Sequence, residues 1–263
     1  MKKLILSLWL LGSLASSSFA SVVVTNGLTH KHQVQSSATE KGIVILKNIG
    51  TNPERILVYF NDLKVGCNSE QLDVAEPGSL ERSNSSWIKV GLQERLLQPG
   101  EEYPLQYNIK TPDSRLEGTY WSLLMIEVKK PIDTASNSYG VKVNSNIRYA
   151  VQIITDFGTQ EATNVSFNNV ELAATSQGKS LIIQLSNNCN KLVIPSVKLE
   201  IYDSNGELLF EKKADTKKLY PTQCRNFALP VNELPLGKYQ AVLVADCGQA
   251  EYFGMTLNLE VDE

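Results

Sequence analysis

The sequence IVILKNIG at residues 43–50 decides the fold, because a similar sequence, IIQLSNNC, recurs at 182–189. Each is an apolar run rich in β-branched residues that reaches an asparagine, Asn48 in the first and Asn187 in the second. This pattern is typical of a buried β-strand that runs into a turn. The recurrence indicates two copies of one β-domain.

Two further landmarks recur in the same order. The turn LQPG at 97–100 corresponds to LYPT at 219–222, and LEGTY at 116–120 corresponds to LGKY at 236–239. The first copy has the longer insert between its first two landmarks. We therefore expect domain one at 21–158 and domain two at 162–263, with a short linker near 156–160, which favours a limited hinge.

The rest of the chain is typical of β-structure throughout. Short runs of Val, Ile, Leu and Tyr alternate with Gly, Pro, Asn, Asp and Ser, and no segment of a dozen residues has a 3.6-residue apolar period. DSNG at 203–206 lies between two such runs and predicts a hairpin, because Asn-Gly provides the positive φ angles of a tight turn. The predicted fold class is all-β, with two tandem immunoglobulin-like β-sandwiches.

The sequence Gly-x-Tyr opens an apolar strand in each half, at Tyr120 and Tyr239. In immunoglobulin-like sandwiches a tyrosine at this place packs inward, and its hydroxyl bonds the backbone of the preceding corner. We predict a structural tyrosine corner at both residues, although an ordinary strand tyrosine is the alternative.

Residues 1–20 have the features of a cleaved signal peptide. Lys2 and Lys3 precede a mostly apolar run at 4–14, and the segment ends in Ser-Phe-Ala. That run is too short to span the hydrocarbon of a bilayer comfortably. We expect an exported mature chain that does not insert into a membrane, in the periplasm or alternatively outside the cell or at its surface.

The charge of the chain excludes some classes of partner. The formal net charge is −3, and it becomes −5 without the leader, which holds two lysines and no acidic residue. Proteins that coat nucleic acid or anionic lipid need a basic excess. We expect a partner of another kind and no nucleic-acid binding.

Export permits disulfides among Cys67, Cys189, Cys224 and Cys247. Four cysteines allow three pairings, and none of them is in a CxxC spacing. Because Cys189 follows one expected strand and Cys224 begins its neighbour, we predict a Cys189–Cys224 bridge. A second bridge, Cys67–Cys247, would then tie the two domains together.

Residues that carry chemistry are few. His30 and His32 would share one face of a strand, but nothing nearby completes a metal site, so we predict no metal and no cofactor. The motifs of triad hydrolases, zinc proteases and nucleotide-binding proteins are absent, and the protein is expected not to be an enzyme. A hydrolase with two distant carboxylates is the weakest alternative. Trp87 and Trp121 are candidates for stacking on sugars, with core packing as the alternative.

The expected last strand of domain one, residues 147–154, is the candidate binding element. Ile147, Tyr149, Val151 and Ile153 share one face of this strand. A long apolar edge strand is an aggregation hazard unless it is covered or used, and a partner's strand could satisfy its free backbone groups. Alternatively, the domain joint or an N-terminal strand covers it.

Three segments carry a resemblance to a known family: SNSSWI at 83–88, LQPGE at 97–101 and GTYWS at 118–122. Together they resemble the immunoglobulin-like domains of bacterial envelope proteins. Two groups are similar, the PapD-like periplasmic pilus-assembly chaperones and the Gram-positive cell-surface proteins associated with WxL domains.

The chaperone resemblance implies a specific site. Chaperones of this family cap fibre subunits with the last strand of domain one, and two basic residues of the cleft hold the subunit's terminal carboxylate. Here the resemblance implies Lys31 and Arg148 for these roles, with Gln152 where the second basic residue would be expected.

These observations lead to two functional hypotheses. The first is an exported, non-enzymatic protein that binds another envelope or secreted protein, as a chaperone-like factor in surface-fibre or envelope assembly. Its candidate partner-binding residues are Lys31, Arg148, Tyr149, Val151 and Ile153. The second is a structural or adhesive surface module that binds cell-wall or other polysaccharide.

Overall fold

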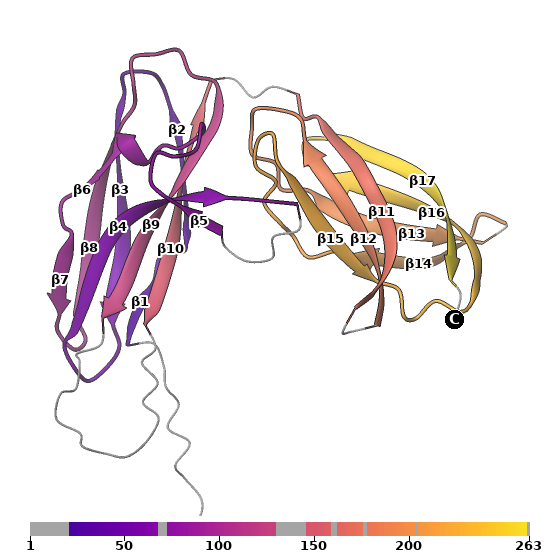
Figure 1. Ribbon diagram of the computed structural model, residues 1–263, viewed down its shortest axis with the longest axis horizontal. Helices are drawn as coiled ribbons and strands as arrows, with labels where there is room; N and C mark the ends of the chain where they lie inside the picture. The colour runs from indigo at the N-terminus through magenta and orange to yellow at the C-terminus, as the bar shows by residue number, and fades with distance from the viewer. Residues whose placement is uncertain are drawn as a thin grey trace, which may run out of the picture.

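The structure is a computed structural model that describes residues 21–67, 73–129, 146–158, 162–175, 178–203 and 205–261. The predicted leader, residues 1–20, lies outside the described residues. The predicted all-β fold is confirmed: Figure 1 shows one β-sandwich in indigo to magenta beside a second in orange to yellow. The one helix described, η1, has three residues, so no described helix is long and apolar enough to cross a membrane.

The elements follow one another in this order: β1 Val22–Val24, β2 Thr29–Val34, β3 Thr39–Asn48, β4 Glu54–Lys64, β5 Asp73–Ala75, η1 Ser85–Trp87, β6 Ile88–Val90, β7 Glu94–Leu97, β8 Glu102–Lys110, β9 Gly118–Lys129, β10 Ile147–Phe157, β11 Val165–Thr175, β12 Gly178–Asn187, β13 Ser196–Tyr202, β14 Leu208–Lys213, β15 Cys224–Pro230, β16 Gly237–Asp246 and β17 Tyr252–Val261.

The first sandwich packs the sheet β1-β3-β8-β6 against the sheet β2-β10-β9-β4-β5, with β7 also paired to β4. Strand β8 illustrates how the sheets pack. Its exposed and buried residues alternate, so that Leu105, Tyr107 and Ile109 enter the core between the two sheets. β9 is buried almost throughout, because its outer face packs against Leu63 and Val65 of its own sandwich and against Tyr220 and Leu192 of the second.

The second sandwich has three strands, β11-β12-β15, facing four, β14-β13-β16-β17. Alternating residues of β12, β13 and β16 form its core, including Leu185, Leu199 and Leu243. The predicted hairpin is confirmed, because Asp203 N–H donates to Glu207 O at 2.9 Å between β13 and β14.

The repeated asparagine forms equivalent hydrogen bonds in both sandwiches. Asn48 donates to Leu97 O at 3.0 Å and to Asn52 O at 2.8 Å, and Asn187 donates to Leu219 O at 2.9 Å and to Lys191 O at 2.8 Å. Each asparagine also accepts from the backbone N–H two residues later. The repeated side chain therefore ties a strand end to the next turn and to the second repeated landmark.

The two predicted tyrosine corners have different outcomes. Tyr239 donates its hydroxyl to Pro235 O at 2.9 Å, four residues upstream, as predicted. Tyr120 forms no such bond among the described residues, and its ring instead packs against Trp87 and Phe157 at 5.1 and 5.7 Å. The prediction is wrong for Tyr120 because this aromatic cluster holds the ring.

The two sandwiches meet through a shared apolar cluster. Trp121 of β9 stacks on Tyr220 with ring centroids 4.5 Å apart, and Leu192 packs beside them. Thr119 N–H donates to Asn190 O at 2.7 Å across the joint. Gly118 is required here, because its φ is +81° and a Cβ would lie 2.0 Å from that same carbonyl oxygen.

One disulfide, Cys67–Cys224, crosses the joint with its Cα atoms 4.6 Å apart. Both predicted bridges, Cys189–Cys224 and Cys67–Cys247, are therefore wrong. The predicted strand neighbours are right, since Cys224 lies opposite Ser186 in the β12–β15 pair. However, Asn187 then turns the chain and accepts the Cys189 thiol at 2.9 Å, and the segment after β4 brings Cys67 to β15 instead.

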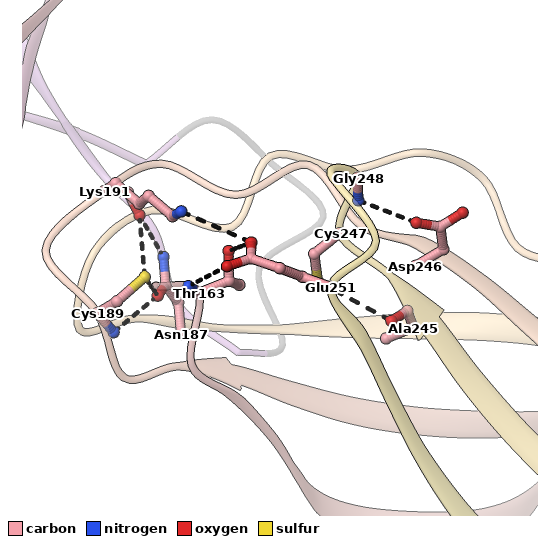
Figure 2. Close-up of polar contacts among 9 residues, drawn as sticks. All are labelled: Thr163, Asn187, Cys189, Lys191, Ala245, Asp246, Cys247, Gly248 and Glu251. Carbon is pink, nitrogen blue, oxygen red and sulfur yellow. Dashed lines mark hydrogen bonds and ion pairs between the residues drawn. The ribbon is translucent and has the colours of Figure 1, made fainter. Parts of the chain in front are cut away.

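Cys189 and Cys247 are free thiols. Figure 2 shows them in separate loops of the second sandwich, Cys189 against Asn187 and Lys191 and Cys247 against Ala245.

Candidate functional site

The candidate binding strand, β10, has one edge that is covered along only part of its length. β9 pairs with all of β10, whereas β2 runs parallel to it and pairs only from Gln152 to Phe157. Within the described residues, the segment Ile147–Val151 has no neighbour on that side. Gln152 N–H donates to Leu28 O on this side, so the strand alternation turns the backbone groups of Arg148 and Ala150 toward the open edge.

Three of the predicted partner-binding side chains face the core of their own sandwich. Val151 and Ile153 are fully buried. Tyr149 is partly buried and donates its hydroxyl to Val22 O of β1 at 2.6 Å. The backbone of this segment, rather than these side chains, is therefore what the strand presents to a partner.

Lys31 and Arg148 are not brought together. Lys31 lies opposite Ile154, six residues along β10 from Arg148, which corresponds to about 20 Å of extended strand. Arg148 is engaged by Glu127, with Nε 3.3 Å from Oε2. The two do not form the pair of basic residues that the family resemblance implies.

Lys218, from the second sandwich, lies next to Gln152, the position at which the family resemblance implied a second basic residue. Its Nζ donates to Thr29 Oγ1 and Gln152 Oε1, and Tyr220 donates to the same Gln152 oxygen at 2.9 Å. Thr29 and Gln152 are the first pair of the β2–β10 ladder, so Lys218 lies where the open edge ends.

The electrostatic environment of Lys218 favours an anion. Desolvation, and then the charge of Lys31, lower the pKa of Lys218 below its ordinary value. Neither lysine has an acidic partner within salt-bridge distance in the described part of the chain. An anion placed between them would relieve this repulsion.

A cleft between the sandwiches is lined in part by Lys31. Lys31, Gln33 and Asp156 line one wall, and Lys191 and Glu251 line the other. Figure 2 shows how the second wall is held: Glu251 accepts the backbone N–H of Thr163 at 2.8 Å and lies 3.7 Å from Lys191 Nζ. Lys191 is thus neutralised within its own domain, whereas Lys31 is not.

The other candidates from the sequence have structural surroundings. Trp121 is buried and donates to Leu63 O at 2.9 Å, and Trp87 packs against Phe157. His30 and His32 both contact the hydroxyl of Tyr107. In the described residues no group of three or more His, Cys, Asp or Glu side chains is arranged to hold a metal ion.

Lys218 was not predicted from the sequence, because it lies in the second domain whereas the strand that it contacts, β10, lies in the first. Its signal was its position directly before the second repeated landmark, LYPT at 219–222. That landmark carries Tyr220 into the domain joint.

No family model and no curated protein matches the sequence. Among solved structures, the chain is similar to the class 5 fimbriae chaperone CfaA, with 15% identity and a TM-score of 0.48 over 92% of this chain and 100% of that one. It is similar to a chain of the CsuC–CsuE chaperone–tip adhesin complex of Acinetobacter baumannii (13%, TM-score 0.49, 90% and 98%). It is also similar to a chain of the Salmonella enterica SafA pilin–SafB chaperone complex (11%, TM-score 0.49, 92% and 99%). Each of these similarities covers at least 90% of this chain.

Proposed function

We propose that this protein is an exported, non-enzymatic binding protein of the cell envelope that holds another envelope protein by β-strand addition. The partner strand pairs with the open edge Ile147–Val151 of β10. Its terminal carboxylate is held by Lys218 together with Lys31. The observation that carries the proposal is the meeting of an open strand edge and two uncompensated lysines at one point.

The geometry gives the partner strand a direction. A strand that runs parallel to β10 along Ile147–Val151 has its C-terminal end beside Gln152, where β2 begins. A free carboxylate at that end can accept from Lys218, and charge-assisted bonds of this kind are about twice as strong as neutral ones. Backbone pairing supplies affinity without sequence preference, and the anchored carboxylate selects the chain end.

The proposed compartment is the periplasm, with the space outside the cell as the alternative. The Cys67–Cys224 disulfide supports an oxidising environment. Polysaccharide binding receives no support, because Trp87 packs against other rings and Trp121 is buried.

A peptide-binding assay tests this function. The probe is a ten-residue peptide of alternating Val and Thr, synthesised once with a free C-terminal carboxylate and once as the amide. We expect the mature protein to bind the carboxylate form about tenfold more tightly, as one charge-assisted hydrogen bond allows. NMR of the complex should show new protection at the amides of Arg148 and Ala150.

Two variants separate the parts of the site. Lys218→Met should abolish the preference for the carboxylate, whereas Lys238→Met, an exposed lysine on β16, should preserve it. Equal binding of the acid and the amide by the unmodified protein contradicts the carboxylate anchor. Absence of binding together with unchanged Arg148 and Ala150 amides contradicts strand addition.

A further inference from the structure

A histidine–tyrosine–histidine contact fastens β2 to the opposite sheet of the first sandwich. His30 Nδ1 lies 3.1 Å from the Tyr107 hydroxyl, and His32 Nε2 lies 2.8 Å from the same oxygen. Both histidines belong to β2, which covers part of β10, whereas Tyr107 belongs to β8 in the other sheet. The contact therefore connects the covering strand to the core.

The other contact of His30, with Gly27 O, determines which atom donates in each hydrogen bond of this network when both rings are neutral. His30 Nε2 lies 3.3 Å from Gly27 O, which can only accept, so this nitrogen carries the proton. In the neutral ring Nδ1 then accepts from the Tyr107 hydroxyl. The hydroxyl oxygen in turn accepts a hydrogen bond from His32 Nε2. The chain of donors runs from His32 through Tyr107 and His30 to Gly27.

Tyr107 has few ways to form this bond elsewhere. Its side chain is 1% exposed, and its ring lies directly over Gly42, where a Cβ would be 2.0 Å from Cζ. Within the described residues, the two histidines are the only hydrogen-bond partners of its hydroxyl. When one histidine is protonated, the hydroxyl still donates to the neutral ring of the other. When both are protonated, both facing nitrogens are donors, and the buried hydroxyl proton has no acceptor, which is costly.

We propose that His30 and His32 together form a pH-sensitive latch: when both are protonated the bond from Tyr107 is lost, β2 is freed and the open edge of β10 extends beyond Val151. The role of the longer edge in partner binding rests on the proposed function, but the latch itself does not. Either histidine alone can hold the hydroxyl, because a neutral ring accepts from Tyr107 while a protonated ring donates to its oxygen. The contact is lost only when neither ring has an acceptor.

The charges around β2 do not compensate a protonated His30. Glu40 of β3 interacts with His32, whose pKa its charge raises, but the larger effects of burial and of His30 lower that pKa. Lys31 lies between the two histidines in sequence, and Lys218 is bonded to Thr29 at the start of β2. Asp156 of β10 is opposite Gln33 and already accepts from Thr119.

The direction of the pH effect follows from the shift at His30. Burial lowers the pKa of His30 below its ordinary value of 6.5, and the bond to Gly27 O opposes this only in part. A base whose pKa is lowered in the closed state stabilises that state above pH 6.5, and this contribution is lost as the pH falls. Burial also lowers the pKa of His32, so the opening equilibrium shifts about tenfold per pH unit for each histidine that takes up a proton on opening.

Hydrogen exchange on the mature protein tests the latch without any partner. Strand β10 contains its own control, because the amides of Gln152, Ile154 and Asp156 face β2, whereas those of Val151, Ile153 and Thr155 face β9. We expect the protection factors of the first set to fall about tenfold or more per pH unit as the pH falls from 6.5 toward the closed-state pKa values of the two histidines. The second set should remain constant. A fall in both sets, or in neither, overturns the proposal.

Variants test whether both histidines are needed. His30→Asn and His32→Gln each place an uncharged amide, which can donate or accept, near the hydroxyl, and each should remove the pH response. A full response in either variant overturns the proposal. In case a variant fails to fold, ¹⁵N NMR of the unmodified protein follows the protonation of both imidazoles. A histidine that stays neutral while the first set of amides loses protection would contradict the latch independently.

Discussion

At the residue scale, one asparagine per domain determines how the repeated strand ends. The side chain of Asn187 is 1% exposed and satisfies two carbonyls and one N–H, and that of Asn48, 0% exposed, does the same in the first sandwich. An aspartate could not replace it, because a carboxylate has no donors for the two carbonyls. The recurrence of asparagine in IVILKNIG and IIQLSNNC thus has a hydrogen-bonding cause.

Replacement of Asn187 by alanine should destabilise the protein strongly. The change removes the side-chain partner of Lys191 O, Leu219 O and Cys189 N–H, of which Leu219 O keeps the N–H of Val193. We expect the free energy of unfolding to fall by about 2–4 kcal/mol. Urea unfolding measures this value, with Asn258→Ala on the exposed face of β17 as the control. Equal midpoints for the two variants would show that the side chain is dispensable.

The four cysteines should differ in alkylation. After denaturation without reductant, Cys189 and Cys247 should react with a maleimide, whereas Cys67 and Cys224 should react only after reduction. In the native protein Cys247 should react slowly, because burial raises the pKa of its thiol to about 11 and the thiolate is the nucleophile. Peptide mapping identifies the labelled residues. Label on Cys67 before reduction contradicts the connectivity.

At the element scale, β2 determines how much of the β10 edge stays open. A parallel strand covers Gln152–Phe157 and stops, so the same strand has a protected half and an open half. This arrangement reduces the edge that could pair with other copies of the chain. It also depends on β3, because the absence of a side chain at Gly42 lets Tyr107 cross to the histidines of β2.

A side chain at Gly42 should disturb this arrangement. In Gly42→Ala the new Cβ meets Tyr107 Cζ at 2.0 Å, so the ring must shift away, and overpacking of this kind costs about 1–3 kcal/mol. Gly91→Ala is the matched control, since nothing lies within 4 Å of its Cβ. The melting temperatures of both variants, measured by thermal unfolding, test this prediction. An unchanged melting temperature for Gly42→Ala would show that the ring can relocate freely.

At the scale of the whole molecule, the joint between the sandwiches builds the site. Tyr220 stacks on Trp121 and bonds Gln152, and the adjacent Lys218 reaches Gln152 from the same segment. The Cys67–Cys224 disulfide also links the two sandwiches at this joint. The lysine of the second domain is therefore positioned only while the domains remain packed together.

Loss of the disulfide should loosen this joint. The bridge connects residues 157 positions apart, and in the chain-entropy model a loop of that length is stabilised by about 5 kcal/mol. The double variant Cys67→Ala/Cys224→Ala should have a lower urea midpoint and lose the carboxylate preference of the peptide assay. Cys247→Ala, which removes a free thiol, is the control. A double variant with unchanged peptide preference would show that the apolar cluster alone holds Lys218.

The sequence by itself determined the strands, the turns and the duplication. The alternation of apolar residues, the Asn-Gly turn at 205–206 and the buried Asn48 and Asn187 are local features, and each has a local physical cause. The edge strand at 147–154 was also predictable, as was Tyr239, whose hydroxyl bonds only four residues away.

Only the tertiary structure decided which distant residues meet. The cysteine pairing and the place of Lys218 beside Gln152 depend on how the two sandwiches pack. The separation of Arg148 from Lys31 is set by the register of β2 on β10 within the first sandwich. Tyr120 failed as a corner because Trp87 and Phe157, distant in sequence but in the same sandwich, pack against its ring. Strand periodicity fixes which face a side chain occupies, but contacts between domains are set by the complementarity of whole surfaces, which no local pattern encodes.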